Sequence, residues 1–234
     1  MTRHTAWRVG FKPQPWEWTD WRWAGADGRF NGRWDPLDQG LYRTIYAGAS
    51  RLGCFVELLA PYRPDEFLSH ELDMIVEDEE DAREFRSIPP GTIDLEQWLA
   101  NRTAASAQIH GNFVDVTSLR IVQELRPRFL ARALELGFSD FDAAALKDSG
   151  HRLLTQEVSQ HLWTRQEPDG RDYCDGIEFR SRHGDDLILW AIFEREADGQ
   201  ISRLVSNIEM EDIALDAEDL HAAISILGLK VLKH

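Results

Sequence analysis

Residues 32–64 read GRWDPLDQGLYRTIYAGASRLGCFVELLAPYRP, and the rest of the chain is organised around this stretch. A charged turn leads into a short apolar strand at residues 41–47, and a helix is expected to begin near Ser50. Four apolar residues recur at the spacing of one buried helix face: Leu52, Phe55, Val56 and Leu59. The stretch therefore predicts a single βα unit.

Glu57 lies inside this apolar run. A carboxylate beside a hydrophobic core is costly when it is desolvated without a partner, so it needs access to solvent or a function. Arg33, in the turn before the strand, is one candidate partner, and Tyr46 supplies an aromatic wall at the end of the strand. The residues alone favour a helix acid paired with a nearby arginine.

The composition is typical of an ordinary folded domain. Of the 234 residues, 43% are hydrophobic and 29% are charged, which predicts one sizeable globular domain. No apolar run approaches the ~20 residues that span a bilayer, and the N-terminus lacks the apolar core of a signal peptide. We therefore expect a cytoplasmic protein without membrane contact.

The formal net charge is −15. This balance argues against direct nucleic-acid binding, which depends on clustered Lys and Arg. It does not exclude a small ligand that carries phosphate, because one or two arginines can hold such a group bidentately.

Strand and helix patterns follow one another without strict alternation. The most apolar strand, at residues 187–193, is expected at the centre of the sheet. A second strand and turn are expected at 104–115, and helices at 93–100, 118–136, 153–163 and 217–227. This mixture predicts an α+β fold.

Tryptophans crowd the first thirty residues. Trp16 and Trp18, and then Trp21 and Trp23, alternate with other residues at a period of two, which is typical of an edge strand or an extended arm packed on the core. A platform for base stacking is the alternative. Packing is favoured because no basic groove accompanies the aromatic residues.

Metal and nucleotide motifs are absent from the sequence. Cys54 and Cys174 have no metal-binding spacing and are expected to be reduced structural thiols. No His-x-x-x-His pair, Gly-x-Gly-x-x-Gly or P-loop occurs, so neither a metal site nor a Rossmann dehydrogenase is expected. The acidic run at 77–81 is typical of a solvated segment.

Two distant segments carry a family resemblance. The first holds Gly-Arg-Trp-Asp at 32–35, Tyr-Arg-x-x-Tyr-Ala at 42–47 and x-x-Phe-x-Glu-x-Leu-Ala at 53–60. The second, at 173–184, reads YCDGIEFRSRHG and precedes an apolar strand. In order and approximate separation they resemble the RES domain, a bacterial toxin family named for an Arg, a Glu and a Ser.

The resemblance implies one RES-like domain over residues 1–234, with a core at about 28–197. A Trp-rich N-terminal arm at 1–27 and a C-terminal helix–strand extension at 198–234 would flank that core. The implied fold is that of ADP-ribosyltransferases, an α+β fold in which a mixed, split β-sheet surrounds a cleft and helices flank it.

RES proteins consume NAD, so the resemblance also assigns site residues. The carboxylate of Glu57 would stabilise the positive charge that develops on the ribose as its bond to nicotinamide breaks. Arg33 would hold the pyrophosphate, with Arg29 as the alternative arginine. Ser181, in the place of the family's Ser, would orient the carboxamide, a phosphate or the attacking group.

Further residues would complete the site. Tyr46, and less strongly Tyr42, would stack on the nicotinamide or the ribose, and Arg182 or Arg180 would help to bind inorganic phosphate. The spacing of Ser181, His183 and Asp185 also invites a triad interpretation. We reject it because residues that alternate along one segment rarely converge.

The resemblance thus implies an NAD-degrading toxin of a toxin–antitoxin system, which transfers ADP-ribose to inorganic phosphate or to water. NAD is the substrate, phosphate is the implied co-substrate and no metal is involved. The implied partner is a cognate antitoxin, often with a helix-turn-helix DNA-binding domain, through which an oligomer would form. Two alternatives stay open: a protein ADP-ribosyltransferase with the same site, and a non-catalytic module that senses a nucleotide or docks a partner.

Overall fold

The computed structural model describes residues 2–63, 89–148 and 150–232. Its strands are β1 (Thr2–Phe11), β2 (Thr44–Gly48), β3 (Thr92–Ile93), β4 (Arg102–Gly111), β5 (Phe113–Asp115), β6 (Gly176–Ser181), β7 (Gly184–Phe193), β8 (Val205–Glu211) and β9 (Lys230–Val231). Its α-helices are α1 (Arg51–Leu59), α4 (Leu95–Leu99), α5 (Leu119–Glu135), α6 (Ala143–Lys147), α7 (Arg152–Thr164) and α8 (Glu218–Leu227). The acidic run at 77–81, for which a solvated segment is predicted, lies outside the described residues.

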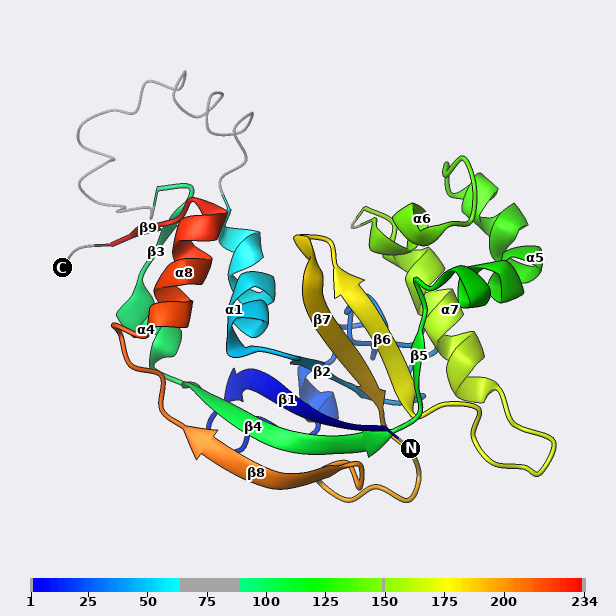
Figure 1. Cartoon of the computed structure of the whole chain (residues 1–234), viewed down its shortest axis with the longest axis horizontal. Coiled ribbons are helices and arrows are strands. Elements are labelled where there is room, and N and C mark those ends of the chain that lie inside the picture. The colour runs from blue at the N-terminus through cyan, green and yellow to red at the C-terminus, as the bar shows by residue number, and fades with distance from the viewer. Residues whose placement is uncertain (1, 64–88, 149, 233–234) are drawn as a thin grey trace.

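A mixed sheet organises the fold, in the order β5-β6-β7-β2-β1-β4-β8 (Figure 1). Only β5 and β6 run parallel, and the other neighbouring strands are antiparallel. β1 pairs with β4 along its whole length but with β2 only at Trp7 and Gly48. The sheet is therefore nearly divided between β1 and β2, which confirms the predicted α+β fold with a mixed, split sheet.

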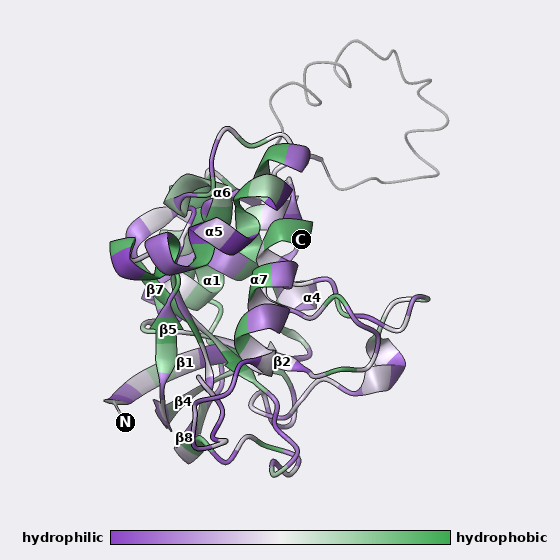
Figure 2. Ribbon diagram, turned by 90° about the vertical axis from the view of Figure 1, so that its right-hand side faces the viewer, coloured by the Kyte–Doolittle hydropathy of each residue, from purple (hydrophilic) through white to green (hydrophobic). Residues whose placement is uncertain are grey.

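Two groups of helices flank the sheet on either side of this division (Figure 1). α5, α6 and α7 pack on β5, β6 and β7 through a cluster that includes Phe129, Leu146, Leu154 and Ile177. α1, α4 and α8 form a second cluster around Phe55, Trp98 and Leu220. Hydrophilic and hydrophobic residues alternate along α5 and α7, as expected for helices that bury one side (Figure 2).

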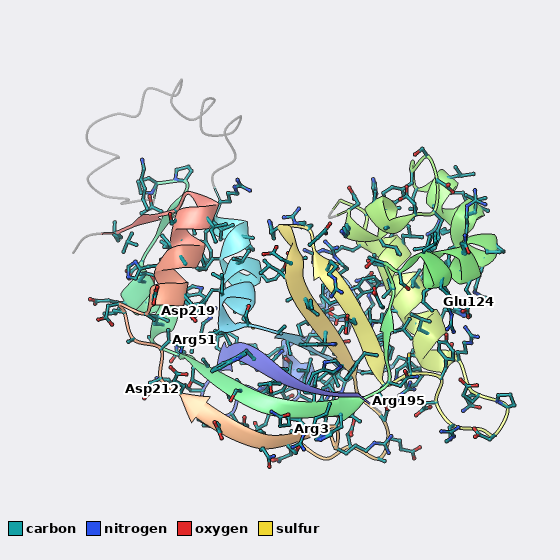
Figure 3. All side chains as sticks on the ribbon, in the orientation of Figure 1. Arg3, Arg51, Glu124, Arg195, Asp212 and Asp219 are labelled. Atoms are coloured by element: carbon teal, nitrogen blue, oxygen red, sulfur yellow. The ribbon has the colours of Figure 1, made fainter. Side chains whose placement is uncertain are left out.

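The βα unit predicted at residues 32–64 is present. β2 occupies the end of the expected strand, and the Ser50 side chain accepts a hydrogen bond from the Gly53 backbone N–H at the start of α1. Phe55, Val56 and Leu59 are buried, and Arg51 is held against α8 by an ion pair with Asp219 (Figure 3). The side chain of Glu57 is half-buried on the same helix.

The N-terminal segment differs from the prediction. Residues 2–11 carry no continuous apolar run, yet they form β1 in the interior of the sheet. Trp16 and Trp18 are buried against the sheet, as the packing interpretation expected, but they lie in a loop rather than an edge strand. β8 was also not predicted, because its exposed edge gives it no apolar pattern.

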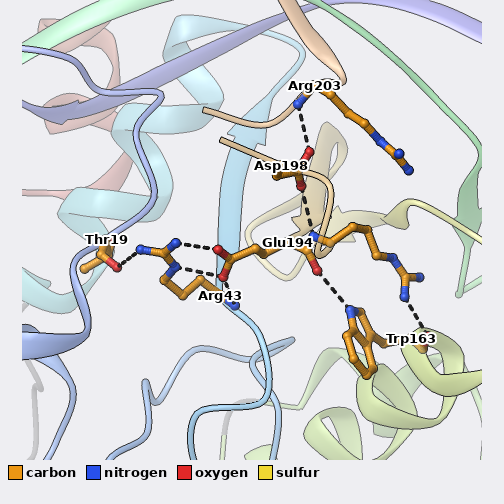
Figure 4. A network of polar contacts seen from close by, with 7 residues as sticks. Thr19, Arg43, Trp163, Glu194, Asp198 and Arg203 are labelled. Atoms are coloured by element: carbon orange, nitrogen blue, oxygen red, sulfur yellow. Dashed lines mark hydrogen bonds and ion pairs between the residues drawn. The ribbon is translucent and has the colours of Figure 1, made fainter. Parts of the chain in front are cut away.

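A polar network fixes this N-terminal loop to the sheet (Figure 4). The guanidinium of Arg43 forms an ion pair with Glu194 and donates a hydrogen bond to the Thr19 carbonyl. The Glu194 carbonyl accepts from the Trp163 indole N–H at 3.0 Å, and Asp198 accepts from the backbone N–H groups of Arg195 and Arg203. The network joins β2 and α7 to the loop that follows β7.

Gly176, at the start of β6, lies where the sheet leaves no space for a side chain. A Cβ atom at Gly176 would lie 2.2 Å from the Ala191 carbonyl oxygen, which is backbone and has no room to move. We expect Gly176→Ala to lower the free energy of unfolding by about 1–3 kcal/mol or more, measured by urea denaturation. Gly199→Ala is the control, because a Cβ at Gly199 meets nothing within 4 Å; equal stability of the two variants would contradict the prediction.

Candidate functional site

Glu57 and Ser181 meet although 124 residues separate them in the chain. The Ser181 hydroxyl donates a short hydrogen bond to Glu57 Oε1 and accepts one from the His183 backbone N–H at 2.9 Å. Ser181 is 2% exposed. The hydroxyl is therefore held from both sides, and the Glu57 carboxylate is oriented by a neutral donor.

A tight turn between β6 and β7 places Ser181. The register shifts between Arg180 and Ser181, and Ser181 then pairs with Gly184, so Arg182 and His183 form the turn itself. This local bulge turns the Ser181 side chain toward α1. Asp185 forms an ion pair with Lys147 instead of facing His183, which agrees with the rejection of a Ser–His–Asp triad.

The turn before β2 places Arg33. Asp35 Oδ2 accepts from the Gly32 backbone N–H, while the Tyr46 hydroxyl accepts from the Trp34 N–H at 2.8 Å and donates to Asp35 Oδ1 at 3.1 Å. A Cβ at Gly32 would lie 2.5 Å from the Tyr46 hydroxyl oxygen, so the turn needs glycine at this position. The Arg33 guanidinium donates to the Leu146 carbonyl at 3.2 Å.

Electrostatics show that Arg33 and Glu57 belong to one group of charges. Burial lowers the pKa of Arg33; the Glu57 carboxylate opposes this shift, whereas Arg182 and Arg152 add to it. Burial also lowers the pKa of His183, again opposed by Glu57 and reinforced by Arg182 and other arginines. One carboxylate thus lies among several cations, in a chain whose net charge is −15.

A cavity of about 350 Å³ opens beside Glu57, at the division between β1 and β2. Tyr46 and Glu57 line it, together with apolar residues from four strands and α1: Val9, Ala47, Leu58, Phe179 and Leu189. Next to the Ser181 turn, a second hollow of about 420 Å³ is lined by Ala60, Arg63, Arg182 and His183. Glu57 lines the first hollow, and its hydrogen-bond partner Ser181 directly precedes the two turn residues that line the second.

The structure therefore brings together most of the residues expected from the sequence. Glu57 and Ser181 are in contact, and Tyr46 lines the cavity. Arg33 lies within electrostatic range of Glu57 and of Arg182. No described cation lies within ion-pair distance of Glu57, so the structure does not show the helix acid–arginine pair that the residues alone favoured.

Tyr42 does not join this group, which corrects the expectation from the sequence. Its ring stacks on Trp163 and meets the edge of Phe193, and its hydroxyl hydrogen-bonds with Ser159 at 2.8 Å. At 2% exposure it is a core residue. The alternative arginine, Arg29, forms a local ion pair with Asp27 at 3.5 Å.

Two residues of the site were missed in the sequence. Arg8 lines the cavity from β1, a strand that the sequence did not predict. Asp35 appeared only as part of a motif, although it holds both ends of the turn that carries Arg33. The short Gly-Arg-Trp-Asp spacing, which allows an acid to cap its own turn, was the available signal for Asp35.

The described part of the chain lacks the features of two other classes of site, metal centres and membrane-spanning helices. Residues 2–63, 89–148 and 150–232 hold no group of three or more His, Cys, Asp or Glu side chains that could bind a metal. None of the helices described is long and apolar enough to cross a membrane. Cys54 and Cys174 are free and buried, and burial raises the pKa of each thiol to about 12, so neither is a reactive thiolate.

Comparisons with known proteins give one structural likeness. No family model matches the chain, and no curated protein matches it in sequence. Among solved structures, a chain from the crystal structure of the M. tuberculosis MbcT–MbcA toxin–antitoxin complex is similar with a TM-score of 0.47 and 13% identity, over 97% of this chain and 90% of that one. A likeness at this level does not define the function of the chain.

The turn that carries Arg33 has a pH-dependent stability. Burial raises the pKa of Asp35 above its ordinary value of 3.8, against the hydrogen bonds from Gly32, Thr44 and Tyr46. The folded state therefore holds this proton more tightly than the unfolded state, so the contribution of Asp35 to stability is lost as pH rises through the folded pKa. We expect the stability of Asp35→Asn relative to wild type to increase as pH rises above the ordinary pKa of 3.8, and to level off above the folded-state pKa of Asp35.

Urea unfolding at a series of pH values measures this difference. Asp169→Asn is the control, because hydrogen bonds from Arg171 lower the pKa of Asp169 and its difference should change in the opposite direction. A stability difference for Asp35→Asn that did not vary with pH would contradict the prediction.

Proposed function

We propose that the chain cleaves the bond between nicotinamide and ribose in NAD and passes the ADP-ribosyl group to inorganic phosphate or to water. The observation that carries this proposal is the contact between Ser181 and Glu57, with Arg33 in electrostatic range of the same carboxylate. Of these three residues, Glu57 also lines a cavity large enough for an aromatic ring. The proposal assigns this cavity to nicotinamide.

The chemistry asks for a fixed negative charge near the sugar. When the bond between C1′ and the pyridinium nitrogen breaks, its electron pair stays with nitrogen, so nicotinamide leaves as a neutral base and C1′ becomes an oxocarbenium ion. The Glu57 carboxylate would stabilise that cation from a position that Ser181 has already set. Attack on C1′ by a phosphate oxygen gives ADP-ribose 1″-phosphate, whereas attack by water gives ADP-ribose and releases a proton.

The cations around Glu57 suit the remaining part of the ligand. A planar guanidinium binds phosphate oxygens bidentately, and Arg33 is fixed at the end of a turn that is itself hydrogen-bonded to Tyr46. Arg63 and Arg182 line the adjoining hollow. We assign Arg33 to the pyrophosphate, Tyr46 to a wall of the nicotinamide cavity, and Arg182 to the acceptor phosphate.

The wider role rests on the RES resemblance in the sequence. We propose that the chain is the toxin of a toxin–antitoxin system and that a cognate antitoxin restrains it by covering the site.

Incubation of the purified protein with NAD, with and without phosphate, tests the chemistry. Phosphate-dependent release of nicotinamide indicates a phosphorylase, release without phosphate a hydrolase, a labelled protein a protein ADP-ribosyltransferase, and binding without turnover a non-catalytic module.

Glu57 is expected to be essential for turnover. Glu57→Gln keeps the shape and an acceptor for the Ser181 hydroxyl but removes the charge, so nicotinamide release should fall by about 10²-fold to 10³-fold; Glu57→Ala should abolish it while the fold is retained. Release is measured by chromatography of the products. Glu196→Gln, at an exposed position, is the control, and a Glu57→Gln variant with near-normal activity would remove Glu57 from the mechanism.

Arg33 and Arg29 are separated by a comparison of two alanine variants. Arg33→Ala should raise the Michaelis constant for NAD and the dissociation constant of ADP-ribose by about tenfold or more, since a bidentate phosphate contact is lost. Arg29→Ala should leave both unchanged, because Arg29 pairs locally with Asp27. The reverse result would transfer the role to Arg29.

A further inference from the structure

Arg8 reaches across the division of the sheet. Its Nη1 donates to the Tyr46 carbonyl on β2 at 2.6 Å, and its Nε donates to the Pro15 carbonyl. Since β1 pairs with β2 only at Trp7 and Gly48, the Arg8 side chain satisfies a β2 carbonyl that has no ladder partner. Arg8 thus spans the gap and at the same time lines the cavity beside Glu57.

The charge of Arg8 is not neutralised by a carboxylate. No acidic side chain in the described ranges forms an ion pair with it, and both of its hydrogen bonds are to carbonyl groups. Burial lowers its pKa to about 10, so the group is still a cation at neutral pH. A guanidinium has five N–H donors, and the two hydrogen bonds leave the others for a ligand in the cavity.

A second guanidinium lines the same end of the cavity. Arg102, at the start of β4, lies over the rings of Trp98 and Phe11, at 4.5 and 4.9 Å from their centroids. Glu57 lines the cavity from α1. The cavity is therefore cationic on the β1–β4 side and anionic on the α1 side, with apolar walls between them that strengthen the field.

We infer that Arg8 is a further catalytic residue, which donates a hydrogen bond to the carboxamide of the bound nicotinamide and favours its departure. This inference rests on the proposed function. Before cleavage the nicotinamide ring is a pyridinium cation, which a neighbouring guanidinium disfavours; after cleavage it is neutral. The positive charge moves from the ring to C1′, that is, away from Arg8 and toward Glu57, so the two residues act in the same direction on the breaking bond.

Substitution of Arg8 tests this role, because kcat and ligand binding are measured separately. Arg8→Met should lower kcat for nicotinamide release by about 10²-fold, while ADP-ribose, which has the pyrophosphate but no nicotinamide, should bind within about twofold of wild type. Arg8→Lys, which keeps the charge without the planar fork, should fall between. Arg22→Met removes an exposed cation from the neighbouring loop and should leave both quantities unchanged.

Two outcomes would overturn the inference while the proposed function stood. One is an unchanged kcat in Arg8→Met, and the other is loss of ADP-ribose binding in that variant, which would place Arg8 at the pyrophosphate. Retained ADP-ribose binding and an unchanged near-ultraviolet circular dichroism spectrum show that the variant is folded. If Arg8→Met does not fold, Arg8→Lys decides the question by the same two measurements.

Direct binding of nicotinamide provides a test that does not need turnover. Titration calorimetry should show binding to the wild-type protein, weakened about tenfold or more in Arg8→Met because a charge-assisted hydrogen bond is lost. If the wild type releases no nicotinamide from NAD but binds free nicotinamide in this Arg8-dependent way, the proposed function and the catalytic role of Arg8 both fail, and only the hydrogen bond from Arg8 to the carboxamide is supported. If nicotinamide binds equally to both proteins, or to neither, the inference fails.

Discussion

The site depends on one constraint. β1 and β2 pair through a single pair of residues and are separated elsewhere. Strands that remain hydrogen-bonded lie ~4.8 Å apart and leave no space between them. Here Trp7 pairs with Gly48, and the strands then diverge, so a cavity forms beneath α1 within the sheet layer. The polar backbone that this exposes needs partners, and the side chain of Arg8 supplies one for Tyr46. The same side chain thus stabilises the division and lines the cavity that the division creates.

The distribution of charge around this cavity is opposite to that of the whole molecule. The chain carries a net charge of −15, yet Arg33 lies within electrostatic range of Arg152 and Arg182 as well as of the Glu57 carboxylate. An acidic surface repels nucleic acids and other polyanions through long-range forces, which salt screens over about 10 Å. A compact ligand with two phosphates can still be held at short range by a local group of guanidinium ions. The overall charge and the local cluster therefore select together for small anions.

Much of the fold followed from hydrophobic pattern. The strand at 187–193 became β7, inside the sheet, and the helix expected from Ser50 became α1 with Ser50 as its cap. Hydrophobic patterns indicate which residues are buried in a core. β1 was missed because its polar residues line a cavity or reach solvent, although the strand itself lies in the interior of the sheet. Motif order indicated Glu57 and Ser181, which the structure places in contact, and Arg33, which lies within electrostatic range of Glu57. Tyr42 was misplaced, since the sequence does not show that this residue, just before β2, packs on Trp163 and Phe193. Arg8 could not be found, because nothing local in its sequence indicates that the neighbouring strand diverges.

The kind of partner that Glu57 has received decides what the carboxylate can do. Glu57 accepts a hydrogen bond from the Ser181 hydroxyl, and no arginine among the described residues forms an ion pair with it. A bidentate arginine would have oriented the carboxylate equally well, but it would also have neutralised the charge that an oxocarbenium ion requires. A neutral hydroxyl, itself held by the His183 N–H, orients the group and leaves its charge available. Under the proposed function, Arg33 holds the anionic part of the ligand and is not paired with the acid, so binding and charge stabilisation are assigned to different residues of one small site.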